Sequence, residues 1–233
     1  LFTDQRNRQA VIDEQGKRVK IPRFDRLIDL GEDYMIFSVK GFVYNILDNK
    51  GNVILKNVDA ATSLDSGYIS YLSKGKFGLL NIRNKTMIEP KYDKPLKRYD
   101  GERFIIEEEG KLGLIDRFDS LFIEAKYEEI LPLNDSIAVL KANFRWTFWN
   151  LNQGRIILDN VSDYWEYVTD TGVFFKIFKG IGYGIWSPAT GLILDSTFDE
   201  LSIKAAGTEL VFITEKWVEE ADLVVMLYYN GTG

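Results

Sequence analysis

The chain has 233 residues, a formal net charge of −6, no histidine and no cysteine. The lack of both residue types excludes Ser-His-Asp and Cys-His catalysis, disulfide bonds, and the thiolate and imidazole ligands typical of zinc. A hydrophobic fraction of 45% is enough for a substantial core. Since no Pro-, Gly- or Ser-rich linker interrupts the sequence, we expect one domain over residues 1–233.

A motif with a period of roughly 35 residues repeats along this chain. Its anchor is an aromatic or apolar residue followed, in most copies, by an acid, and the first members lie 34, 34, 35, 34 and 37 residues apart. The anchors are Phe24-Asp25, Val58-Asp59, Tyr92-Asp93, Tyr127-Glu128, Val161-Ser162 and Phe198-Asp199. The copies lie near 7–40, 41–74, 75–109, 110–142, 143–179 and 180–216, with a partial copy at 217–233.

Each copy is predicted to form short strands. Phe77–Ile82, Thr86–Glu89 and Arg103–Glu107 are rich in β-branched and aromatic residues, and glycine, asparagine, aspartate and proline separate them. No window carries a sustained apolar stripe at helical spacing. The sequence therefore predicts an all-β repeat fold of about six antiparallel units, each with three or four strands.

One such unit cannot bury its own apolar face, so neighbouring units must stack and share a core. We expect a β-propeller of six or seven small blades. The alternative is an open β-solenoid, which the short repeat favours.

Two sets of glycines keep the period. Gly78, Gly113 and Gly184 each follow a large apolar residue, fourteen positions before the anchor, which indicates a bulge or a close backbone approach. The glycines that open the copies suit hairpin turns with positive φ; they are Gly41, Gly75, Gly110 and Gly180. The acid after each anchor is expected to accept a hydrogen bond from a backbone amide in the following turn.

The runs Lys76–Asn81 and Ile88–Asp93 resemble the bacterial WG repeat, and the likeness extends over about six copies. Phe77, Leu112 and Tyr183 stand where that family places tryptophan. The resemblance implies a binding or scaffold module and supplies no catalytic residue.

The fifth copy departs most from the repeat and supplies our candidate binding residues. Residues 144, 146 and 148 alternate onto one face of a predicted strand, which favours an aromatic platform that stacks on a sugar or anchors a protein. The alternative is that these aromatic side chains fill the core. The candidates are Phe144, Trp146, Phe148, Trp149 and Trp165.

Carboxylates are the remaining candidate catalysts. The periodic acids recur in every copy and are expected to have a structural role. A carboxylate-dependent carbohydrate hydrolase would need two acids about 5–10 Å apart, and the non-periodic candidates are Glu102, Glu107 and Asp170. The loop from Asp48 to Asn52 holds oxygen ligands suited to calcium but lacks EF-hand spacing, so we expect a hairpin turn, no metal and no cofactor.

Charge and hydropathy limit the partners. We identify no basic cluster, since Asp93, Asp100 and Glu102 offset Lys94, Lys97 and Arg98, and nucleic-acid binding is not expected. The apolar run Leu223–Tyr229 is far too short to span a membrane. A start at Leu1 suggests trimming from a longer protein. A bacterial envelope or secreted location is slightly favoured over the cytoplasm. We expect a non-catalytic module that binds a protein or glycan, with a hydrolase or a purely structural scaffold as alternatives.

Overall fold

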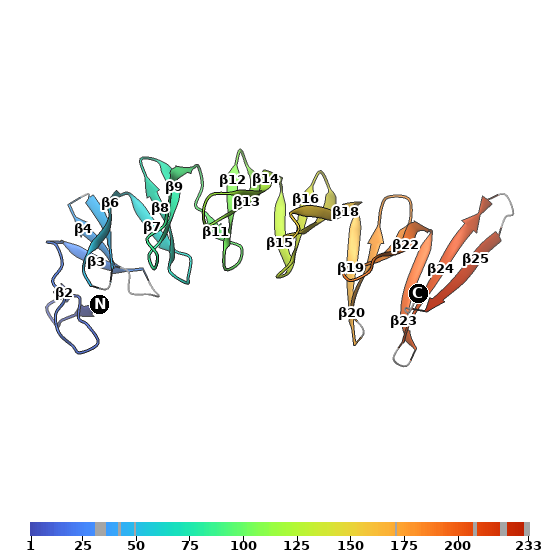
Figure 1. Ribbon diagram of the computed structural model, residues 1–233, viewed down its shortest axis with the longest axis horizontal. Coiled ribbons are helices and arrows are strands. Elements are labelled where there is room, and N and C mark those ends of the chain that lie inside the picture. The colour runs from blue at the N-terminus through green and yellow to red at the C-terminus, as the bar shows by residue number, and fades with distance from the viewer. Residues whose placement is uncertain are drawn as a thin grey trace. The chain divides into compact units, whose positions relative to one another are not determined.

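The computed structural model describes residues 1–30, 36–41, 43–48, 50–170, 172–206, 209–219 and 223–230. These residues form antiparallel strands joined by tight turns, which confirms the all-β repeat fold (Figure 1). In the described residues, no helix is long and apolar enough to cross a membrane. The chain divides into two compact units, Leu1–Ile130 and Leu131–Gly233.

The first unit holds one strand pair and three four-stranded sheets. The pair consists of β1 (Phe2–Thr3) and β2 (Gln9–Ala10). The first sheet contains β3 (Arg26–Asp29), β4 (Ile36–Lys40), β5 (Val43–Leu47) and β6 (Val53–Val58). The second contains β7 (Ala60–Ser63), β8 (Tyr68–Ser73), β9 (Lys76–Asn81) and β10 (Met87–Tyr92). The third contains β11 (Lys97–Arg98), β12 (Arg103–Glu108), β13 (Lys111–Asp116) and β14 (Leu121–Tyr127).

The second unit begins inside the next four-stranded sheet and holds two more sheets. The first of the three contains β15 (Glu129–Asn134), β16 (Ile137–Ala142), β17 (Arg145–Asn150) and β18 (Arg155–Val161). The next contains β19 (Asp163–Thr169), β20 (Gly172–Phe178), β21 (Tyr183–Ser187) and β22 (Gly191–Phe198). The last contains β23 (Glu200–Ala206), β24 (Glu209–Val218) and β25 (Leu223–Asn230).

Each sheet is a meander whose strands follow one another in chain order, as in the blades from which β-propellers are built. A sheet runs from one anchor to the next, so it is displaced by half a period from the copies defined by the opening glycines. Each such copy supplies the third and fourth strands of one sheet and the first two of the following sheet. Closure of the sheets into a propeller ring, with an open solenoid as the alternative, stays a prediction.

The expected close approach at the period-fixed glycines is confirmed. A Cβ atom on Gly78 would lie 2.5 Å from the carbonyl oxygen of Ile88, and one on Gly113 would lie 2.7 Å from that of Ile123. At both places the register between the third and fourth strands shifts, which is the signature of a bulge. The fourth strand therefore bends across the third where no side chain intervenes.

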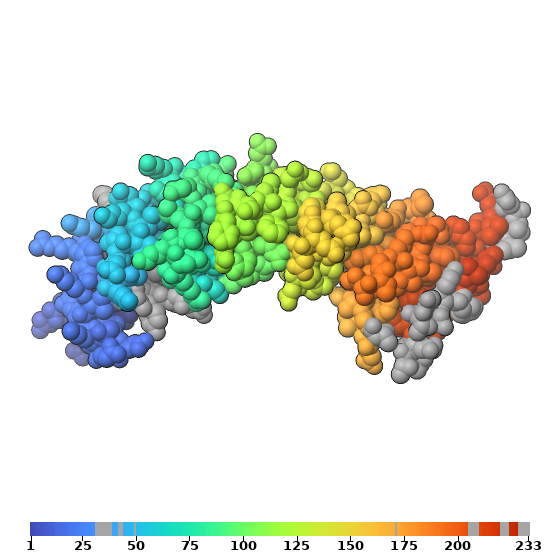
Figure 2. All heavy atoms as spheres, in the orientation of Figure 1, coloured from blue at the N-terminus to red at the C-terminus, as the bar shows by residue number. Residues whose placement is uncertain are grey.

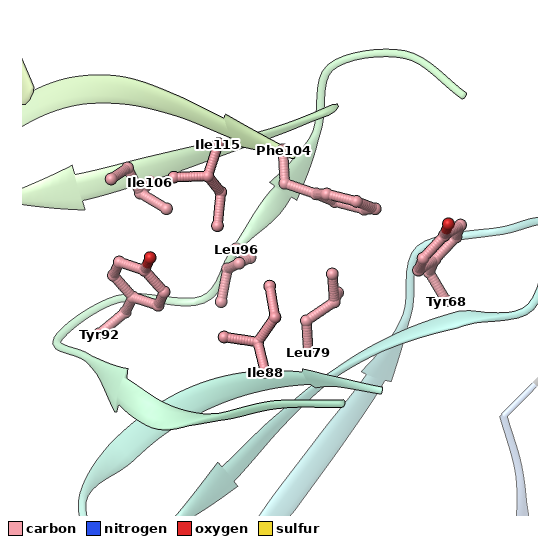
Figure 3. Packing of buried hydrophobic residues seen from close by; sticks show 8 residues of the cluster. All are labelled: Tyr68, Leu79, Ile88, Tyr92, Leu96, Phe104, Ile106 and Ile115. Carbon is pink, nitrogen blue, oxygen red and sulfur yellow. The ribbon is translucent and has the colours of Figure 1, made fainter. Parts of the chain in front are cut away.

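The core lies between neighbouring sheets as well as within them. In the first unit, Tyr68, Leu79, Ile88 and Tyr92 from the second sheet face Phe104, Ile106 and Ile115 from the third, and Leu96 from the connecting segment lies between them (Figure 3). The other face of the second sheet packs on the first sheet through Ile69, Tyr71 and Leu80. A middle sheet is thus apolar on both faces, which is why β8 shows no inside-outside alternation.

The second unit has the same stacking. One cluster joins its first two sheets through Val139, Phe148, Phe175 and Trp186. Another cluster joins the last two sheets, and Phe212 is at its fully buried centre. Aromatic rings fill these thin layers at edge-on or tilted angles, as between Phe148 and Phe175.

Candidate functional site

The periodic acids are engaged by the repeat itself. Three of them accept a hydrogen bond from an amide in or beside the next hairpin: Asp25 from Gly41 at 2.6 Å, Asp59 from Lys74 at 2.8 Å, and Asp199 from Trp217 at 2.5 Å. The bond spans fifteen to eighteen residues, so it is not the local turn expected from the sequence. In each case the acid directly precedes the first strand of a sheet. The second strand runs antiparallel to the first, so the end of the second strand lies next to the acid.

Asp93 and Glu128 have a different partner. Asp93 forms an ion pair with Lys76, and Glu128 forms one with Lys111 at 3.2 Å. Each lysine begins the third strand of the same sheet, opposite the end of the fourth strand. The carboxylates of these two acids therefore stabilise a sheet edge.

The non-periodic acids do not form a catalytic pair in the first unit. Glu102 forms an ion pair with Arg117 at 2.8 Å. Glu107 lies five residues further along β12, and a strand rises about 3.4 Å per residue, so the two backbones lie roughly 17 Å apart. This exceeds the separation that a glycosidase requires. Asp170 lies in the second unit, after β19.

The loop that begins at Asp48 is a hairpin turn. One oxygen of the Asp48 carboxylate accepts the amides of Lys50 and Asn52, and the other accepts the Asn52 side-chain amide. Both oxygens of this carboxylate therefore accept N–H groups from the turn itself. Within the described part of the chain, no group of three or more acidic side chains is placed to hold a metal.

The fifth-copy aromatics do not form one surface. Phe144 is 86% exposed in the β16–β17 turn, where both Asn143 and Phe144 have positive φ. Trp146 packs against the core edge, with its ring edge-on to Tyr164 at 5.5 Å between centroids. Phe148 is fully buried between two sheets. Because a neighbouring sheet covers this face of β17, the expected platform of residues 144, 146 and 148 is not displayed.

The two remaining candidates lie in different places. Trp149 is partly buried, and its indole nitrogen is buried without a hydrogen-bond acceptor. Trp165 lies on β19 and is 40% exposed. Of the five candidate aromatic residues, Phe144 and Trp165 are therefore the two whose rings are open to a ligand.

The Lys176 side chain lies beside the Trp165 ring. Its ammonium group lies 5.4 Å from the centroid of the Trp165 ring and 4.0 Å from that of Tyr183, and it donates to the Leu201 carbonyl at 2.7 Å. Burial lowers the pKa of Lys176, and the nearby Glu200 carboxylate partly opposes this effect. The lysine thus ties β20 to β23 and holds an exposed indole between fixed neighbours.

A second exposed apolar patch lies on the last sheet. Trp217 on β24 is 48% exposed and pairs directly with Val224 on β25. Val224 and Met226, two residues apart on one strand face, are each about half exposed. We call Trp217, Val224 and Met226 the terminal-sheet patch.

Sequence reasoning missed a basic groove in the first unit. Its lining includes Arg18, Lys20, Arg23 and Lys40, around a cavity of about 640 Å³. The signal was present, because residues 17–23 hold four cations and no acid. Lys40, however, comes from β4 and joins them only in the folded chain.

The sequence matches no protein-family model and none of the curated proteins with which it was compared. Among solved structures, Hsv2p of Kluyveromyces lactis is 13% identical, with 83% of this chain and 73% of that chain covered and a TM-score of 0.33. The dihydro-heme d1 dehydrogenase NirN is 13% identical, with 90% and 54% covered and a TM-score of 0.32. PorZ, a bacterial surface component of the type-IX secretion system of Porphyromonas gingivalis, is 13% identical, with 94% and 35% covered and a TM-score of 0.29.

This chain thus spans about half of the matched NirN chain and about a third of the PorZ chain. At these identities and TM-scores, the fold assignment rests on the sheets of this chain alone.

Proposed function

We propose that this protein is a non-catalytic interaction module that binds a glycan through Trp165. The exposed, fixed indole of Trp165 is the observation that supports it. An aromatic ring that is held in place before binding loses little conformational freedom when a sugar stacks on it. The Lys176 ammonium and the Tyr183 ring restrict the indole, while 40% of Trp165 remains open.

The engaged acids support the non-catalytic part of the proposal. Four periodic carboxylates in the first unit accept amide hydrogen bonds or pair with lysines; they are Asp25, Asp59, Asp93 and Glu128. We infer that an acid recurs at this position because it helps to stabilise each sheet. We propose accordingly that the chain is a divergent repeat protein of the WG type, in which the repeat supplies the scaffold and individual copies supply the contacts.

A protein partner is the second candidate, and the terminal-sheet patch favours it. Tryptophan and methionine are enriched in protein interfaces, and three exposed apolar side chains here share one face of the last sheet. Burial of these side chains would contribute a few kcal/mol, at about 25 cal/mol per Å² of apolar area.

The test is an oligosaccharide array, followed by tryptophan-fluorescence titration of each ligand that binds. We expect Trp165→Ala to weaken binding by about fivefold or more, since stacking on one aromatic ring contributes on the order of 1–3 kcal/mol. Trp217→Ala is the matched control, because it removes an indole of similar exposure from another sheet. An array without a ligand would reject the glycan proposal. Loss of binding in Trp217→Ala alone would move the contact to the terminal-sheet patch.

A further inference from the structure

We propose that the basic groove of the first unit is a binding site for a small oligoanion that carries two or more phosphate or sulfate groups. The groove lies in a different unit from Trp165, and the proposal does not depend on the glycan site. The chain as a whole carries a formal charge of −6. The four cations around this cavity therefore form a local positive charge on a molecule whose net charge is negative.

The four cations of the groove are exposed, and none of them has an acidic partner among the described residues. Within the part of the chain that the structure describes, no carboxylate pairs with Arg18, Lys20, Arg23 or Lys40. Among the described residues of the lining, the one acid is Asp25, and one of its oxygens accepts the Gly41 amide at 2.6 Å. The described lining thus carries a net positive charge that an anionic ligand would neutralise.

The segment that carries three of these cations is fixed by its apolar residues. Val19, Ile21 and Phe24 pack against the core of Val11, Leu27 and Leu47. The Val19 amide donates to the Val11 carbonyl at 2.8 Å. A Cβ on Gly51 would lie 2.6 Å from the Ile21 side chain, so the segment also lies tightly on the β5–β6 turn. Val19, Ile21 and Phe24 are thus half-buried, whereas Arg18, Lys20 and Arg23 are exposed. The segment belongs to the N-terminal part coloured blue in Figure 2.

Size and geometry point to a small ligand with several charges. A cavity of about 640 Å³ is within the usual range for small-molecule sites. Arg18 and Arg23 are five residues apart, a stretch of chain that spans at most about 18 Å. One phosphate or sulfate group would reach only part of this length. Two guanidinium groups can each bind such a group with paired N–H donors, and the ammonium groups of Lys20 and Lys40 add further charge.

A long nucleic acid fits the groove less well. Single-stranded nucleic acids bind to rows of exposed aromatic rings along a basic channel. Among the described lining residues, Phe24 is the one aromatic residue, and its ring is half-buried against the core, so these residues offer no row of exposed rings. The net negative charge outside the groove would also repel a long polyanion.

The test is isothermal titration calorimetry with two probes, tripolyphosphate and a sulfated disaccharide, which represent the two sources of this chemistry. The double variant Lys20→Met/Lys40→Met keeps two unbranched side chains, each one heavy atom shorter than lysine, and removes two charges from the groove. Its matched control is Lys94→Met/Lys97→Met, which removes two exposed charges elsewhere in the same unit. Both variants have a net charge of −8, which is −6 minus 2.

We expect the groove variant to bind at least tenfold more weakly than the unmodified chain and the control to stay within twofold. Binding of either probe with this pattern supports the proposal and identifies the source of the anion. Absence of binding by both probes at about 1 mM would overturn it, as would an equal loss in both variants. Tighter binding of a short single-stranded oligonucleotide than of either probe would overturn the small-ligand class.

Discussion

Gly78 is the position where a single methyl group should disturb the repeat most. In Gly78→Ala, the new Cβ would lie 2.5 Å from the Ile88 carbonyl oxygen and 2.8 Å from Cζ of Tyr71. The first contact is with backbone, so the third and fourth strands must separate to relieve it. The second is with a fully buried ring whose hydroxyl donates to that same carbonyl at 3.2 Å.

The expected cost has two parts. Overpacking of a filled core by one methyl group costs about 1–3 kcal/mol. Loss of the Tyr71 hydrogen bond adds about 0.5–1.5 kcal/mol. We therefore expect Gly78→Ala to lower the free energy of unfolding by roughly 1.5–4.5 kcal/mol.

Urea denaturation followed by far-ultraviolet circular dichroism measures this change. Gly101→Ala is the control, because a Cβ there meets no atom within 4 Å, and it should be neutral or stabilise the chain by up to about 1 kcal/mol. In a Tyr71→Phe background, Gly78→Ala should cost less, since the hydroxyl that the methyl group approaches is gone. A free energy of unfolding for Gly78→Ala within about 0.5 kcal/mol of that for Gly101→Ala would refute the close-approach argument.

Two further predictions concern single side chains of the first unit. Burial, with a smaller contribution from the Glu89 carboxylate, raises the pKa of Tyr71 to about 12, whereas a tyrosine in the unfolded chain titrates near pH ~10. The stability that the neutral Tyr71 hydroxyl contributes should thus be complete below pH ~10 and be lost as the pH rises toward about 12. The urea midpoint, measured at stepped alkaline pH, should therefore fall less in Tyr71→Phe than in the unmodified chain. An identical fall in the two would contradict this assignment. Asp59→Ala removes the acceptor of the Lys74 amide and should cost about 1 kcal/mol, with Asp59→Asn costing less. Glu14→Ala, at an exposed residue, is its control in the same denaturation assay, and an equal stability of the two alanine variants would show that the periodic acid does not stabilise the hairpin.

The sequence by itself determined the repeat, the strands and the role of the glycines. These features depend on local chemistry: β-branched and aromatic runs broken by turn residues form strands, and a glycine after an aromatic residue permits close backbone approach. The predicted strand Phe77–Ile82 accordingly corresponds to β9 within one residue at each end. Gly78 likewise lies where the bulge occurs.

The tertiary structure alone decided which side chains are available to a partner. Strand alternation separates the two faces of a strand, but it does not say which face a neighbouring sheet covers, and in stacked sheets both faces are covered. Phe148 is therefore buried while Trp165, a similar aromatic residue in the same copy, is exposed. Lys40 joins Arg18, Lys20 and Arg23 only because β4 returns beside the segment that precedes β3. Long-range pairing of this kind, rather than composition, places the groove and the exposed indole.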